Sequence, residues 1–355
     1  FPVMLISMAL VMAGSLEELR LDGFFALVPL SGLSIGFREV LTWNSEHPIH
    51  WIGLGLTVIV HLGLTFGLLR RIVRLLAPEA ESDEARVSSL VEQRREDLRK
   101  EVPWAYALAL ASILVVPSNF PILMSLEGQV LWNQGLMLAI PAFLLWRQGI
   151  PLREGLRLRS CHIKFFLVAL AMGPLLQMAA NSAAIATAQF LPIPEEMVKQ
   201  MTQMLLPEGA NPVKLLLLLA LSPAICEEVA FRGVLVYSLS RWGEPKQTTR
   251  QRLQISILVG LIFGFFHLSL ARILPTAIAG FWITWLSLSS GSLLPGILLH
   301  FLNNSEAVVA HINHVDLASF PLWVWPLSWL GLLLLGILME RWHKAEPPPR
   351  RGKGR

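Results

Sequence analysis

Long apolar runs alternate with short polar segments along most of the chain. The run at 50–69, HWIGLGLTVIVHLGLTFGLL, lacks Asp, Glu, Lys and Arg and has the roughly 20-residue length that a membrane-spanning helix needs. This pattern predicts an all-α, polytopic transmembrane bundle, with about eight core spans and about two further spans upstream. The predicted spans are 1–14, 50–69, 103–123, 129–146, 164–190, 213–240, 253–271, 273–290, 293–312 and 322–340.

Lysine and arginine concentrate in the segments that follow residues 69, 146, 240 and 340. Alternating the predicted spans places all four segments on one side of the membrane. Cytoplasmic loops carry an excess of Lys and Arg, so this side is predicted to be cytoplasmic. The sequence therefore predicts a multi-pass protein of the cell inner (plasma) membrane.

Composition supports a membrane protein. The chain has 355 residues, of which 54% are hydrophobic and 15% are charged, whereas a soluble domain has about 25% charged residues. The formal net charge of +4 comes from basic loops beside apolar runs, so nucleic acid is not expected as a partner. The expected partners are the lipid bilayer and a membrane-associated peptide or protein.

A highly charged segment at 78–102 divides the chain and is predicted to be a helical cytoplasmic linker. Residues 103–342 form the predicted core bundle, and 343–355 are a basic tail.

The upstream membrane segment, 1–77, contains FFALVPLSGLSIGFREVL and resembles the end of a sodium-export-type ABC transporter permease. That resemblance implies ABC-transporter subunits as partners. Because the chain begins at Phe1 within an apolar run, we also expect a further N-terminal part.

The stretch AICEEVAFRG, residues 224–233, places charged side chains inside a predicted span. A charge at the bilayer centre costs roughly 2.5 to 3.5 kcal/mol on insertion scales. Glu228 and Arg232 are four residues apart on a helix, so they share a face and can pair. Glu227 points about 100° away from that face, so pairing with Arg232 leaves its burial unexplained.

Two further predicted spans carry polar residues at similar depth. Counted from the cytoplasmic ends, Glu227 and His267 lie about 20 Å into the membrane, Asn304 about 16 Å and His300 about 10 Å. We therefore expect these four side chains to form one cluster. Arg272 falls at the outer end of its predicted span, where its long side chain can reach the interface.

Two kinds of chemistry fit this cluster. A desolvated Glu227 beside His267 suits proton abstraction from water, while His300 and Asn304 can donate hydrogen bonds to an oxyanion. Alternatively, Glu227, His267 and His300 match a two-histidine, one-glutamate zinc site with an open position for water. Both routes lead to peptide hydrolysis, and the sequence leaves both open.

Three short motifs carry a resemblance to a known family. EEVAFR fits EExxxR, FGFFH fits FxxxH, and HFLNN fits HxxxN, in that order on successive predicted helices. In this combination the chain resembles the CAAX protease and bacteriocin-processing (CPBP) family of intramembrane proteases, relatives of the Ras-converting CAAX endopeptidase. The resemblance implies a helical membrane core with a conical cavity that holds the site. It also implies a protease for which both a metal-dependent and a metal-free mechanism have been considered.

Carried onto this chain, the resemblance implies that the first glutamate and the first histidine, Glu227 and His267, activate water. The second histidine and the asparagine, His300 and Asn304, would stabilise the oxyanion. The remaining motif residues would support the site structurally; they are Glu228, Arg232 and Phe263.

The competing interpretation is a non-catalytic membrane scaffold or an ABC-transporter permease component. A permease is expected to spread polar residues along a pathway, whereas here they converge on three predicted helices. The sequence therefore favours a CAAX-type intramembrane (metallo)endopeptidase that hydrolyses a peptide bond of a membrane-associated substrate.

Overall fold

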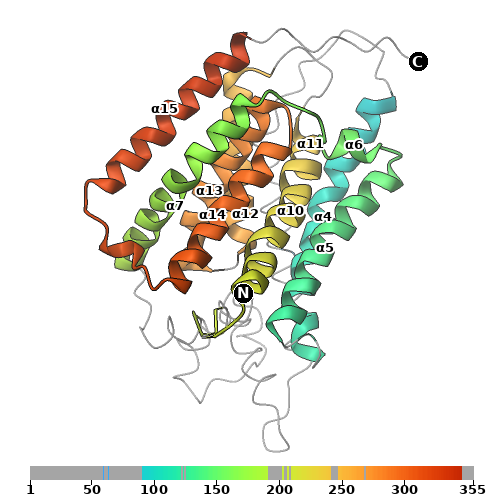
Figure 1. The fold of residues 1–355 in the computed structure, drawn as a ribbon. Helices are drawn as coiled ribbons and strands as arrows, with labels where there is room; N and C mark the ends of the chain where they lie inside the picture. The colour runs from blue at the N-terminus through green and yellow to red at the C-terminus, as the bar shows by residue number, and fades with distance from the viewer. Residues whose placement is uncertain are drawn as a thin grey trace, which may run out of the picture.

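A computed structural model of the chain describes the part that carries the predicted core bundle (Figure 1). The described residues are 90–120, 125–190, 206–207, 209–240, 247–267 and 269–345, with the isolated positions 59, 63, 123, 202 and 203. The predicted spans at 1–14 and 50–69 lie outside this part, apart from two isolated positions. The upstream segment that resembles a permease therefore stays a prediction.

The described part consists of helices and contains no strand, which confirms the all-α fold. The long helices are α4 (Leu90–Asn119), α5 (Leu126–Arg147), α7 (Lys164–Phe190), α12 (Thr249–Phe266), α13 (Leu270–Ser290), α14 (Leu294–Ile312) and α15 (Val324–Ala345). Between α7 and α12, a continuous helical rod comprises α9 (Pro212–Leu215), η2 (Leu216–Leu221), α10 (Ser222–Glu228), η3 (Val229–Leu235) and α11 (Val236–Leu239). The short connecting elements are α6 (Leu152–Gly155) and η4 (Leu317–Ser319).

Helices cover each of the eight spans predicted between residues 103 and 340. Among the described residues, four helical segments are long and apolar enough to cross a membrane: α5, α7, the part of α13 from Arg272 to Ser290, and α15. The outer face of α15 exposes Leu330, Leu333, Leu334 and Ile337, whereas Arg232 is fully buried. Apolar surface outside and charge inside is the arrangement of a multi-pass membrane protein.

The charged segment predicted as a linker continues into the bundle. Helix α4 begins at Leu90, well before the predicted span, and Leu98 is fully buried. The Arg95 guanidinium lies 4.7 Å from the ring centre of Tyr237, and Arg99 donates a hydrogen bond of 3.0 Å to the backbone oxygen of Ser238. Arg95 and Arg99 therefore attach this part of α4 to α11.

Small residues bring α12 and α13 into close backbone contact. A Cβ atom on Gly260 would lie 2.7 Å from the Ala277 backbone oxygen, and one on Gly264 would lie 2.6 Å from that of Ile273. Gly260 and Gly264 are four residues apart, the spacing of small residues at close helix contacts in membranes. This contact fixes the face of α12 that carries Phe263 against α13.

The described basic segments share one end of the molecule. In Figure 1, α6, α11 and the C-terminal end of α15 lie at the same end of the bundle. At this end the buried Arg252 forms an ion pair with Glu340 of α15 and donates a hydrogen bond of 3.0 Å to Ser289. This arrangement agrees with the alternation of spans that the loop charges indicated.

Candidate active site

The rod that carries the two glutamates departs from regular α-helical geometry on both sides of them. Segments η2 and η3 are π-helical and flank α10, which ends at Glu228. Wider π turns occur often at functional sites in helices. Side chains of other helices bond carbonyl groups of both segments: Asn304 Nδ2 donates to Leu219 O at 3.3 Å, and the Tyr106 hydroxyl donates to Ala230 O.

Glu228 and Arg232 form a buried ion pair, as their helical spacing predicts. Arg232 Nη1 lies 2.6 Å from Glu228 Oε1, and both side chains are fully buried. The same guanidinium donates to Thr284 Oγ1 at 3.1 Å and to the Gly280 backbone oxygen at 3.0 Å. Arg232 therefore ties the rod to α13 behind the cluster of polar residues.

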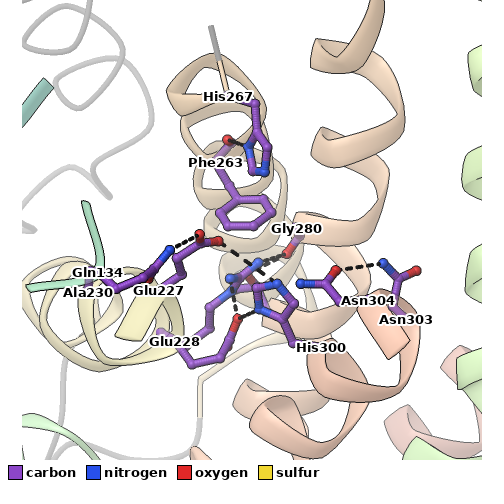
Figure 2. A network of polar contacts seen from close by, with 12 residues as sticks. Gln134, Glu227, Glu228, Ala230, Phe263, His267, Gly280, His300, Asn303 and Asn304 are labelled. Atoms are coloured by element: carbon purple, nitrogen blue, oxygen red, sulfur yellow. Dashed lines mark hydrogen bonds and ion pairs between the residues drawn. The ribbon is translucent and has the colours of Figure 1, made fainter. Parts of the chain in front are cut away.

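His300 of α14 lies between the two glutamates (Figure 2). Its Nδ1 is 2.9 Å from Glu228 Oε1, a hydrogen bond in which the carboxylate accepts. Its Nε2 is 3.9 Å from Glu227 Oε2, too far for a direct hydrogen bond. Glu228 thus orients the imidazole so that Nε2 points toward Glu227, a role that the spacing of the motif did not reveal.

One carboxylate oxygen of Glu227 accepts a hydrogen bond, whereas the other makes only the long contact with His300. Gln134 of α5 donates from Nε2 to Glu227 Oε1 at 3.2 Å. Glu227 Oε2 is buried and has no hydrogen-bond partner among the described residues. A buried carboxylate oxygen without a hydrogen bond is costly, so this atom is a candidate to bond a small molecule that enters the site.

His267 occupies a different position from the one predicted. It was expected within a span, but α12 ends at Phe266 and His267 forms its C-cap, with Nδ1 2.8 Å from the Phe263 backbone oxygen. The Phe263 ring makes edge contacts with both imidazoles, at centroid distances of 4.7 Å to His267 and 5.7 Å to His300. Phe263 also faces Arg232, whose guanidinium lies 4.5 Å from the ring centre. Figure 2 shows His267 on one side of this ring and His300 on the other.

All four residues predicted to be catalytic line one cavity of about 360 Å³. Its remaining wall is largely apolar, with contributions from α4, α5, α12, α13 and α14. The structure thus brings Glu227, His267, His300 and Asn304 to a common space, although it does not test the chemical role of any of them.

Several polar residues of the cavity were missed by the sequence interpretation. Arg272, expected at the interface, lines the cavity, as do Gln129, Asn133 and Gln134 of α5 and Asn303 of α14. The available signal was the spacing on α5. Residues 129 and 133 are four apart and share one face of an otherwise apolar span, which indicates a polar cavity wall there, and residue 134 lies about 100° from 133.

The three residues proposed as zinc ligands do not converge in this arrangement. Glu227 and His300 are near each other, but the Phe263 ring lies against His267 on one side and His300 on the other. No group of three His, Cys, Asp or Glu side chains among the described residues is close enough to hold a metal ion. A site formed by these ligands would require His267 to move around Phe263.

The cavity combines a buried carboxylate (Glu227), two imidazoles (His267 and His300) and an amide (Asn304). Hydrolytic sites use such groups to activate water and to stabilise an oxyanion. The class of protein indicated is therefore a hydrolase within a multi-pass membrane bundle. Residues 209–305 match the family model described as Rce1-like, type II CAAX prenyl endopeptidase. The matched range contains the EExxxR, FxxxH and HxxxN motifs and confirms the resemblance to CAAX proteases, which supports a CAAX-type endopeptidase. No curated protein and no solved structure matches the chain.

Tyr106 of α4 supports the rod directly behind the site, and this contact gives a first testable prediction. Tyr106→Phe removes the donor to the Ala230 carbonyl in η3 but keeps the ring contacts with Phe231 and Phe266. Leaving a buried acceptor without its partner costs about 1 to 3 kcal/mol. We expect a lower thermal midpoint in detergent together with a moderate loss of peptidase turnover, because the displaced segment follows Glu227 and Glu228.

Tyr237→Phe is the matched control, since Tyr237 is the other tyrosine of the chain. Its hydroxyl is 2.9 Å from Glu154 Oε1 at the end of the bundle that carries α6. This variant should also lose stability but keep its turnover. Equal turnover losses in the two variants would contradict a specific link between Tyr106 and the site.

Proposed function

We propose that the chain is an intramembrane endopeptidase that hydrolyses a peptide bond of a membrane-associated protein or peptide, with Glu227 as the general base. The observation that carries the proposal is Glu227 Oε2, which is buried without a hydrogen bond in a residue that lines a cavity of about 360 Å³. The Rce1-like match over 209–305 supports the same reaction class.

In the proposed first step, Glu227 takes a proton from a water molecule in the cavity. The resulting hydroxide attacks the carbonyl carbon of the scissile peptide bond. His267, on the same cavity wall, assists by hydrogen bonding to this water. Gln134 keeps one carboxylate oxygen fixed, so the other oxygen faces the water throughout the step.

The oxyanion of the tetrahedral intermediate is stabilised by His300 and Asn304. Glu228 accepts from His300 Nδ1 and so holds the ring with Nε2 toward the cavity, where Nε2 is proposed to donate to the oxyanion. An amide group has two N–H donors; one of those on Asn304 reaches Leu219 O, and the second is proposed to reach the oxyanion. Glu227 finally passes its proton to the leaving amine, which yields a new carboxylate and a new amino terminus.

We propose the inner (plasma) membrane as the location, because the basic loops gather on one side. The proposed partners are the bilayer and a substrate whose cleaved segment reaches the cavity. Association with ABC-transporter subunits remains a proposal that depends on residues 1–77.

The test is cleavage by the purified full chain in lipid nanodiscs. Apolar peptides from a proteome digest, with and without a prenylated cysteine near the carboxyl end, are supplied, and mass spectrometry identifies the new termini. We expect internal cleavage that persists under strong chelation. Activity that is lost on chelation and restored by zinc would favour the zinc site instead. A folded protein that cleaves none of the peptides would favour the scaffold.

A further inference from the structure

The cavity walls present a set of hydrogen-bond acceptors that the proposed reaction does not use. Three amide side-chain oxygens are buried without a hydrogen-bond partner among the described residues: Asn133 Oδ1, Gln134 Oε1 and Asn303 Oδ1. All three residues line the cavity that contains Glu227. Two of these residues lie on α5 and one on α14, so amide side chains with an unsatisfied oxygen border the cavity from two different helices.

For Gln134 and Asn303, the hydrogen bond of the amide nitrogen indicates which end of the amide is the oxygen. Gln134 Nε2 donates to Glu227, and Asn303 Nδ2 donates to Asn304 Oδ1 at 3.4 Å. A carboxylate can only accept, so Gln134 must present its nitrogen to Glu227 and its oxygen elsewhere. Figure 2 shows Gln134 and Asn303 on opposite sides of the site.

Buried acceptors need donors from whatever occupies the cavity, because leaving each one unpaired costs about 1 to 3 kcal/mol. Neutral amide oxygens suit neutral N–H donors better than they suit anions. The intervening wall is apolar and includes Val130 and Met137 of α5. An extended peptide with apolar side chains offers both matching features, since its backbone N–H groups recur along its length between apolar side chains.

We propose that Asn133, Gln134 and Asn303 form a subsite that binds the backbone N–H groups of an extended peptide substrate next to Glu227. The inference rests on the proposed function and adds to it the part of the substrate that is recognised. Affinity from backbone contacts is tolerant of side-chain sequence, as in other sites that bind extended peptides. The apolar residues of the cavity wall would then determine which substrate side chains are preferred.

Binding to a catalytically inactive protein tests the subsite separately from the reaction. The full-length Glu227→Gln variant in nanodiscs is titrated with a fluorescein-labelled octapeptide of leucine and alanine, and fluorescence anisotropy gives the dissociation constant. The peptide is then methylated at one backbone nitrogen at a time, which removes a single donor without changing the protein. At least one methylation should weaken binding by about fivefold or more, the scale of a lost buried hydrogen bond.

Protein variants identify the acceptors. In the same inactive background, Asn133→Leu and Asn303→Leu should each weaken binding of the unmodified peptide by about fivefold. Each should also remove the sensitivity to methylation at one position. Asn313→Leu is the matched control, because Asn313 lies at the end of α14 outside this cavity and donates to Val309 O. It should bind the peptide as its parent does.

The outcomes separate the two proposals. A flat methylation scan, unchanged affinity in both Asn133→Leu and Asn303→Leu, or no binding by folded protein would overturn the subsite. Methylation-sensitive binding in a protein whose parent cleaves nothing would support the subsite while refuting the proposed function. If the parent protein cleaves peptides but no methylation changes the binding affinity, the proposed function would be supported and the subsite refuted.

Discussion

Glu227→Gln is expected to lower peptidase turnover by at least about 100-fold, the scale of a lost general base. Glutamine keeps the size of the side chain and can still bond Gln134, but it cannot take a proton from water. The atom that is changed, Glu227 Oε2, has no hydrogen-bond partner among the described residues, so folding should be retained. Turnover and thermal midpoint are measured in the same nanodisc preparation.

Glu306→Gln is the control for removing a carboxylate from the bundle. Glu306 lies on α14 like His300, but it lines a separate groove with Leu302, Val309 and Ala310. Its variant should keep turnover within about twofold, because it leaves the general base in place. Near-normal turnover in Glu227→Gln would refute the catalytic assignment and favour a scaffold.

Glu228→Gln is expected to destabilise the fold first and to lose activity as a consequence. The substitution leaves Arg232 fully buried without its counter-charge, and breaking a buried pair in this way costs roughly 3 to 5 kcal/mol. It also replaces the carboxylate that accepts from His300 Nδ1, so the imidazole loses the group that orients it. The measurements are yield, thermal midpoint and turnover at a temperature where the variant is still folded.

The double variant Glu228→Gln/Arg232→Gln separates these two effects. Removing both charges should recover much of the thermal midpoint, because no uncompensated charge remains. Turnover should stay low, since His300 is still without its carboxylate partner. Full recovery of turnover would show that Glu228 acts only through Arg232. No recovery of the midpoint would mean that the ion pair is not the main source of the lost stability.

The positions of the spans were predictable from sequence, because a membrane helix is recognised by a continuous apolar run of sufficient length. Both features can be read from a short stretch of the chain. Helices were found over each span predicted from 103 to 340, and the helical spacing of Glu228 and Arg232 correctly indicated their pairing. The motifs likewise indicated the family, since each one fits within a single helix. Their chemical roles stay predictions.

Boundaries near polar residues were less predictable. The span predicted to contain His267 ends at Phe266, and the connection to α13 places Arg272 on the cavity. Composition does not distinguish one long helix from two helices joined by a tight turn when apolar residues continue through it. The start of α4 at Leu90 was not predicted as part of a span, because the first turns of this helix are charged and lack an apolar run.

The sequence by itself determined that this protein is a helical membrane bundle with a glutamate, two histidines and an asparagine inside it, because burying such groups in lipid requires partners. Only the tertiary structure decided which partner each group has. It placed His300 between Glu227 and Glu228, put Phe263 between the two imidazoles, and brought the amides of α5 to the cavity. Apart from the contact of Phe263 with His267, these contacts join residues far apart in the chain, and the packing of whole helices fixes them.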